Sequence, residues 1–284
     1  MKIINDIFIG ANQKASLIDL EKPNPWNQEL VIFVHGFMGF KDWGAWNLVQ
    51  DYFVNQGYAF CKFNLSHNGG TIDDGFDFPD EEAFGQNRYS YEIEDLNCAL
   101  DYARQKLNSI QKIHLIGHSR GGAVVLIHGK NNPNITSITT WASISSIENR
   151  MPQGEELKKW QESNVRYIKN GRTFQELPQY YSLFEDFEEN KEKFDLEKVV
   201  KDLHKPLCIL HGEADTSVKI EEGEKLSKWS GIPVKKIKDA DHVFMTRHPW
   251  NKTQLSIQMV EVCELTIEFI EKGYNHLTSP EANL

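Results

Sequence analysis

Cysteine is scarce in this chain, and its few cysteines are scattered. The four are Cys61, Cys98, Cys208 and Cys263. None belongs to a CxxC pair, which argues against a zinc site of the paired-cysteine type, and their spacing suggests no disulfide framework. Cys61 and Cys208 lie in apolar runs, where a buried and reduced thiol is expected. We therefore expect neither a metal nor a disulfide.

Long apolar runs are also missing. No segment approaches the roughly 18 consecutive apolar residues that a membrane-spanning helix needs, so we predict no membrane span. The first residues, MKIINDIFIGANQKASL, lack the basic, apolar and small-residue regions of a secretory signal. These two absences predict a soluble protein in the cytoplasm.

Basic residues are outnumbered by acidic ones. The 284 residues include 31 Lys and Arg against 41 Asp and Glu, for a net charge of −10. Such a chain has no net attraction for phosphates, and no basic run reverses that balance, so nucleic acid is not an expected partner. We expect instead a small-molecule substrate and a monomer or homodimer.

Short apolar runs alternate with segments of helical length. The run in residues 90–107 repeats its apolar side chains at helical spacing. Two strands at the start, 3–11 and 15–20, are expected to be antiparallel. Further strands are predicted at 30–36, 58–65, 112–118, 137–145, 206–212 and 233–240. This alternation predicts an α/β fold with a mainly parallel central sheet and helices on both faces.

The alternation breaks at residues 147–204, which are charged, aromatic and poor in strand patterns. A structureless loop of that length is unusual, so we expect several helices. They either cover the sheet or form a cap over a pocket, and the cap is favoured because sites in such sheets lie beyond the strands' carboxyl ends. The predicted organisation is a core of residues 1–146 and 205–284 with a helical cap insertion at 147–204.

The motif GHSRG, residues 117–121, follows an apolar strand and precedes a run typical of a helix. A serine in an ordinary glycine-rich turn is one interpretation. The other is a nucleophile, because a sharp strand-to-helix turn lifts the hydroxyl of Ser119 off the sheet and places it near a helix N-terminus. The strand before it and the helix after it favour the nucleophile.

A serine nucleophile needs a base, and the base needs an acid that orients it. The expected chain order is serine, acid, histidine. Among ten histidines, His242 lies in a loop after the last strand and follows every plausible acid, with His248 as the substitute. Asp215, in the loop after strand 206–212, is the preferred acid. Glu213 and Glu148 are its competitors.

Two backbone N–H groups are expected to hold a developing oxyanion. One belongs to Arg120, the residue after the serine, and the other to Phe37, in the loop after strand 30–36. Apolar side chains of that loop are candidates for a pocket wall, together with a histidine that ends another strand. The candidate pocket residues are Met38, Phe40, Trp43 and His67.

Four segments in this order resemble the α/β-hydrolase superfamily: HGF (35–37), GHSRGG (117–122), HGEADTSV (211–218) and DADHVF (239–244). Within it, the chain resembles the dienelactone hydrolase-like and serine peptidase-like esterases. The resemblance implies an α/β-hydrolase fold, a Ser119–Asp215–His242 triad and hydrolysis without a cofactor or a metal. A serine nucleophile departs from the cysteine of the dienelactone hydrolases proper, so their substrate is not implied.

These residues predict a serine hydrolase that cleaves a carboxylic ester, or a thioester, through an acyl-enzyme. An aminopeptidase or amidase using the same residues is an alternative, and it would need an acidic group in the pocket to bind an amine. A non-catalytic binding protein on the same fold is the third alternative, because a fold alone does not establish a function.

Overall fold

The computed structural model describes residues 1–272 of the chain. Its main feature is an eight-stranded sheet with the strand order β1-β2-β4-β3-β5-β6-β9-β10. Pairings of β1 with β2 and of β2 with β4 are antiparallel, and all the others are parallel. The strands are β1 (Lys2–Ile9), β2 (Ala15–Glu21), β3 (Glu29–Val34), β4 (Ala59–Phe63), β5 (Lys112–His118), β6 (Ser137–Trp141), β9 (Leu207–Gly212) and β10 (Lys235–Ile237).

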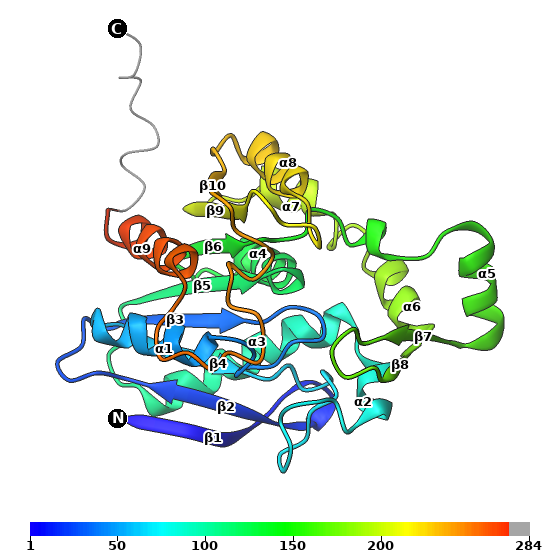
Figure 1. The fold of residues 1–284 in the computed structure, drawn as a ribbon, viewed down its shortest axis with the longest axis horizontal. Helices are drawn as coiled ribbons and strands as arrows, with labels where there is room; N and C mark the ends of the chain where they lie inside the picture. Colours follow the sequence, from blue (N-terminus) through cyan, green and yellow to red (C-terminus); the bar gives the residue numbers. More distant parts are fainter. Residues whose placement is uncertain (273–284) are drawn as a thin grey trace, which may run out of the picture.

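Helices cover both faces of this sheet (Figure 1). One face carries α1 (Trp46–Asn55) and α9 (Ile257–Lys272), and the other carries α3 (Tyr89–Lys106) and α4 (Arg120–Asn131) together with α7 (Leu196–Lys201) and α8 (Ile220–Ser230). No helix among residues 1–272 is long and apolar enough to cross a membrane. The predicted mainly parallel sheet with helices on both faces is confirmed.

Strand β3 shows why a continuous apolar run forms this sheet. Leu30, Ile32 and Val34 pack into the core on the α3 and α4 side, whereas Val31 and Phe33 pack on the α1 and α9 side. Side chains of a strand alternate between its two faces, so a strand buried on both faces must be apolar throughout. Each predicted strand overlaps one of the observed strands, and the helix predicted at 90–107 corresponds to α3.

The segment after β6 is more mixed than the sequence predicts. It begins with a 3-10 turn (Glu148–Arg150) and α5 (Gly154–Ser163), and it continues with β7 (Val165–Lys169), β8 (Glu176–Tyr180) and α6 (Ser182–Glu189). Strands β7 and β8 form an antiparallel hairpin of their own. With α5, the hairpin projects beyond the carboxyl ends of the parallel strands (Figure 1).

The hairpin was not predicted, because VRYIK alternates over only five residues and is charged. The far end of the segment also differs from a cap, because α7 packs against α4 and α8 on the face of the sheet. We therefore use "cap" for residues 148–189 only. Contacts between α2 (Glu81–Gln86) and strand β8 of the hairpin tie the cap to the rest of the molecule.

Candidate active site

Ser119 stands at the turn between β5 and α4. Its backbone has φ 56° and ψ −120°, a conformation that side-chain-bearing residues rarely adopt. The turn is held by the Ser119 N–H, which donates to the Trp141 carbonyl at 2.9 Å, and by the Ser119 carbonyl, which accepts from Gly122 N–H at 3.0 Å. Such strain persists only where the surroundings impose it, and it is common at functional sites.

Glycines on either side of Ser119 let the turn close. A Cβ at Gly117 would lie within 3.0 Å of the Gly121 carbonyl oxygen, and one at Gly121 would lie within 3.0 Å of the carbonyl oxygens of Val34 and His35. These neighbours are backbone atoms and cannot rotate away. The motif's glycines therefore bring α4 against the end of β3 and fix the position of Ser119.

Asp215 and His242 are joined by a hydrogen bond. Asp215 lies in the loop after β9, and its Oδ2 is 2.7 Å from His242 Nδ1. The other carboxylate oxygen accepts from the N–H groups of Ser217 at 2.8 Å and Val218 at 2.9 Å. A carboxylate with these partners is fixed in orientation, and it presents one oxygen to the imidazole.

The electrostatics of this pair favour a charged carboxylate. Burial by itself would raise the pKa of Asp215, but hydrogen bonds from His211 and His242 hold it well below its usual range. His118 lies close by and donates from Nε2 to the His242 carbonyl at 2.8 Å. Burial lowers the pKa of His118 to about 3, so it is neutral and adds no positive charge near His242 at neutral pH.

The competing residues are placed elsewhere. Glu213 and Glu148 are exposed, and Glu148 lies 3.4 Å from Lys191 in an ion pair. His248 accepts a hydrogen bond at Nδ1 from Gly44 N–H at 3.0 Å. Of the candidate acids and bases, Asp215 and His242 are the pair that the structure joins.

The loop after β3 packs directly on Ser119. A Cβ at Gly36 would lie 2.8 Å from the Ser119 Cβ, so only glycine lets the loop come this close. His35 holds the loop: its Nδ1 donates to the Gly36 carbonyl at 2.8 Å, and its Nε2 accepts from Leu65 N–H at 3.1 Å.

The two N–H groups predicted to hold an oxyanion are those of Phe37 and Arg120. Within residues 1–272, Phe37 N–H donates no hydrogen bond. Arg120 N–H is in the first turn of α4, where a helix supplies no acceptor.

Two cavities meet at Ser119 and His242, and Phe37 and Ser217 also border both. We call the first, of about 580 Å³, the aromatic cavity. The wall residues that it does not share with the second include Met38, Trp43, Trp46, Arg172 and His248.

We call the second cavity, of about 420 Å³, the arginine cavity. Its distinctive wall residues are Tyr89, Arg120, Ile144, Arg150, Met151, Arg166, Ile168, Gln179 and Leu183. Both volumes are in the range of small-molecule sites.

Two of the four candidate pocket residues border these cavities and two do not. Met38 and Trp43 line the aromatic cavity. Phe40 is fully buried and packs in a cluster with Phe78, Phe84 and Leu177. His67 is buried beside Ser66, whose Oγ is 2.8 Å from its Nδ1. Both are therefore core residues here, because the strand-end loops that carry them turn inward.

The hairpin contributes side chains to the site that the sequence does not predict. Arg166 and Gln179 are directly paired across β7 and β8, and both border the arginine cavity. The signal available was the alternation in VRYIK, which places Arg166 and Ile168 on one face of a strand. Nothing in the sequence alone says what that face covers.

The described residues offer no group of three or more His, Cys, Asp and Glu side chains that could hold a metal ion. Cys61, Cys208 and Cys263 are buried and free, as predicted for the first two, and Cys98 is half-buried and free. Residues 273–284 of the predicted core lie outside the described residues.

Solved structures share this fold at low sequence identity. Est1E from Butyrivibrio proteoclasticus matches with a TM-score of 0.69 and 20% identity, covering 93% of this chain and 97% of that one. An esterase domain from Rhodothermus marinus matches with a TM-score of 0.63 and 19% identity, covering 94% and 97%. A monoacylglycerol lipase from Paleococcus ferrophilus matches with a TM-score of 0.65 and 13% identity, covering 90% and 98%.

No curated protein matches the chain in a sequence search. A family model described as the alpha/beta hydrolase fold matches residues 29–170, which is half of the chain. That stretch runs from β3 through the Ser119 turn to the end of β7. With the sheet order, the Ser119 turn and the structural matches, this establishes that the chain belongs to the α/β hydrolase fold family.

Proposed function

We propose that the protein is a serine hydrolase that cleaves a carboxylic ester through an acyl-enzyme. The observation that carries this proposal is the Asp215–His242 hydrogen bond beside Ser119, with Ser119 and His242 on the wall of both cavities. A base oriented by a buried carboxylate, next to a serine on a strained turn, is the arrangement that activates a hydroxyl.

In the proposed mechanism, Ser119 Oγ attacks the ester carbonyl carbon while its proton passes to His242. The oxyanion that forms accepts hydrogen bonds from the N–H groups of Phe37 and Arg120. His242 then gives its proton to the leaving alcohol, and the C–O bond breaks. Water then attacks the acyl carbon and gives a proton to His242, which passes it to Ser119 Oγ as the bond between Oγ and the acyl carbon breaks and the carboxylic acid leaves. Asp215 stabilises the imidazolium in both halves.

An ester suits the cavities better than a peptide with a free amine. Binding an ammonium group requires an unengaged carboxylate, and no Asp or Glu borders the arginine cavity. Asp241 borders the aromatic cavity, but its Oδ1 accepts from Val243 and Met245 N–H at 3.1 and 2.8 Å. The aromatic cavity suits an apolar or aromatic arm, and Est1E, which shares the fold, has been solved with ferulic acid bound.

The test is hydrolysis of short p-nitrophenyl esters by the wild type and by Ser119→Ala. We expect kcat to fall by a factor on the order of 10⁶, as loss of the nucleophile does in serine hydrolases. Alanine keeps the Cβ of serine, so the turn should fold unchanged, and far-ultraviolet circular dichroism checks this.

Ser217→Ala is the matched control. Ser217 also borders both cavities, but its contact with Asp215 is made by the backbone, which alanine retains. A fluorophosphonate should add its mass to the wild type and to Ser217→Ala, and not to Ser119→Ala. Unchanged turnover in folded Ser119→Ala would show that the nucleophile lies elsewhere. A folded wild type that neither labels nor hydrolyses any ester would favour the non-catalytic binding protein.

A further inference from the structure

Positive charge is concentrated in the arginine cavity. Arg120, Arg150 and Arg166 border it, and no Asp or Glu does. The chain as a whole carries a net charge of −10, so this concentration runs against the average character of the protein. The three arginines differ in how far acidic residues behind the wall already neutralise them.

Arg120 is buried and neutralised by Glu92. Its Nε donates to Glu92 Oε2 at 2.9 Å, and its Cζ lies 3.8 Å from the centre of the Tyr89 ring. Its Nη2 is 2.9 Å from Glu92 Oε1. These two contacts form a two-pronged pair with the Glu92 carboxylate, and only 7% of Arg120 is exposed. Arg120 therefore offers a ligand in the cavity little free charge.

Arg150 is neutralised by a shared carboxylate. Its Nη2 donates to Glu222 Oε1 at 2.9 Å. Glu222 also accepts from Ser145 N–H at 2.7 Å through its other oxygen. Arg150 therefore holds the end of the loop after β6 in place, and it offers the cavity little free charge.

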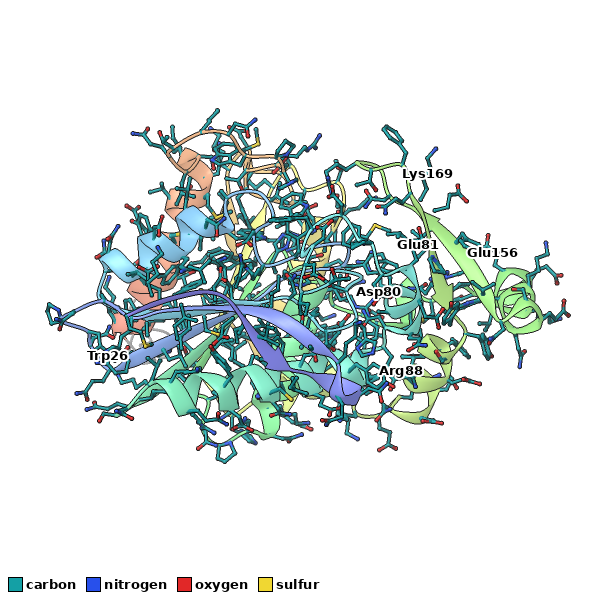
Figure 2. All side chains as sticks on the ribbon, turned by 90° about the horizontal axis from the view of Figure 1, so that it is seen from below. Trp26, Asp80, Glu81, Arg88, Glu156 and Lys169 are labelled. Atoms are coloured by element: carbon teal, nitrogen blue, oxygen red, sulfur yellow. The ribbon has the colours of Figure 1, made fainter. Side chains whose placement is uncertain are left out.

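Arg166 is the arginine whose charge is not matched. Among the described residues it forms no salt bridge with a carboxylate. Its Nε, at 2.8 Å, and its Nη2 both donate to the neutral Gln179 Oε1, and its Cζ lies 4.3 Å from the centre of the Trp160 ring. Glu156 acts on Arg166 only through space: it is exposed on α5, at the outer edge of the cap (Figure 2).

Apolar side chains surround this unmatched cation on the cavity wall. They are Ile144, Met151, Ile168 and Leu183. Half-burial and an apolar surrounding strengthen the interaction of a guanidinium with an anion, because less water screens it. Nε and Nη2 already donate to Gln179, so a carboxylate placed here could accept in a two-pronged geometry from the other edge of the guanidinium, formed by Nη1 and Nη2.

We propose that the arginine cavity receives an arm of the ester substrate that ends in a carboxylate, with Arg166 as its main partner. This proposal rests on the proposed function, because the scissile carbonyl must lie at Ser119, where the two cavities meet. The other arm then occupies the aromatic cavity. Arg166 would select between substrates and would take no part in the bond changes.

The test compares esters that differ only in this charge. Monoethyl adipate, with a free carboxylate on the acyl arm, is compared with its primary amide. 4-Acetoxybenzoate, with the carboxylate on the alcohol arm, is compared with 4-acetoxybenzamide. We expect the wild type to prefer the carboxylate in one of the two pairs by about tenfold to a hundredfold in kcat/KM, the range of a hydrogen bond to a charged group. The pair that shows the preference identifies the arm.

Variants locate the origin of the preference. Arg166→Gln should remove it by lowering kcat/KM for the carboxylate ester while leaving the amide ester within about twofold, and Arg166→Lys should restore part of it. Lys169→Gln is the matched control: it removes a cation from the same strand, but Lys169 is exposed on the other face of β7 and lies at the end of the hairpin (Figure 2). This variant should keep the full preference.

Three results would overturn the proposal. One is a wild type that hydrolyses the carboxylate and amide esters equally well in both pairs. Another is an Arg166→Gln variant that keeps the preference for the carboxylate ester. The third is an Arg166→Gln variant that loses activity equally on the carboxylate ester and the amide ester of a pair. In each case Ser119 would still react with a fluorophosphonate, and the proposed function would stand. If Ser119 does not react and no ester is hydrolysed, both proposals fall.

Discussion

The strand ends and the cap face the same two cavities, but they are built differently. Around Ser119, the ends of β3, β5 and β9 are held by backbone contacts and buried side chains. The glycines of the turns cannot be replaced without a steric clash. In the cap, Arg166 and Gln179 stand on a two-stranded hairpin whose outer residues Tyr167 and Phe174 are 61% and 70% exposed. The proposed chemistry therefore lies on the rigid region and the proposed selectivity on the adaptable one.

This division has a physical basis. A proton transfer depends on distances between a few atoms, so it gains from a site that other contacts fix. Recognition of a substrate arm can be changed by one or two side chains without moving those atoms. Substitutions at the strand ends should consequently affect every substrate, whereas substitutions in the cap should affect some substrates and spare others.

The largest effect expected in the rigid region, after loss of Ser119 itself, is that of Asp215→Asn. Asparagine Oδ1 can still accept from the N–H groups of Ser217 and Val218, so the loop should keep its shape. Its amide would face His242 Nδ1 as a donor and favour the wrong tautomer. We expect kcat to fall by about 10⁴-fold on neutral and charged esters alike, as in other serine triads. Steady-state kinetics with p-nitrophenyl esters measure the loss.

Asp241→Asn is the control for that experiment. It removes a carboxylate next to His242 in the sequence, but Asp241 binds backbone N–H groups and has no contact with the imidazole among its hydrogen bonds. Turnover should stay within about tenfold of the wild type, since only a loop contact is weakened. If the two variants lost activity equally, the pairing of Asp215 with His242 would have no special role in the reaction.

A smaller effect, on stability, separates the regions more directly. Gly121→Ala would place a Cβ against the backbone carbonyls of Val34 and His35, so β3 and α4 must move apart. We expect the free energy of unfolding to fall by about 2–3 kcal/mol, the upper part of the range for overpacking. Urea denaturation followed by tryptophan fluorescence measures it.

Gly171→Ala, at the tip of the hairpin, is the matched substitution in the cap. A Cβ there meets nothing within 4 Å. The free energy of unfolding should therefore change by less than about 0.5 kcal/mol. A loss of similar size at both glycines would contradict the contrast between a rigid and an adaptable region.

The same contrast decides how much of the molecule can be predicted from its sequence. Strands such as β3 are apolar on both faces, and this pattern predicts the sheet without knowledge of its neighbours. The turn at Ser119 carries glycines that backbone sterics demand, so its motif can be recognised locally. Asp215 and His242 could be predicted because each lies in a loop that follows a strand. In the structure, Asp215 Oδ2 is 2.7 Å from His242 Nδ1.

Features that depend on long-range packing could not be predicted in this way. Phe40 and Met38 lie two residues apart in one loop, yet Met38 borders a cavity and Phe40 enters the core. Arg166 borders a cavity because β7 pairs with β8 and the hairpin lies beyond the carboxyl ends of the parallel strands. In each case the local sequence is compatible with both outcomes, and distant contacts decide between them.

The smallest expected effect is a pH dependence with a single step. Burial lowers the pKa of His118 to about 3 and that of His35 to about 4, and hydrogen bonds keep Asp215 ionised. Above about pH 5 these three groups therefore hold one charge state and contribute no step to the pH dependence. For a neutral ester, log kcat/KM should rise with pH along a slope of about 1 on the acid side. A slope near 2 would mean that a second group titrates, and that the strand ends are less dry and less rigid than their burial indicates.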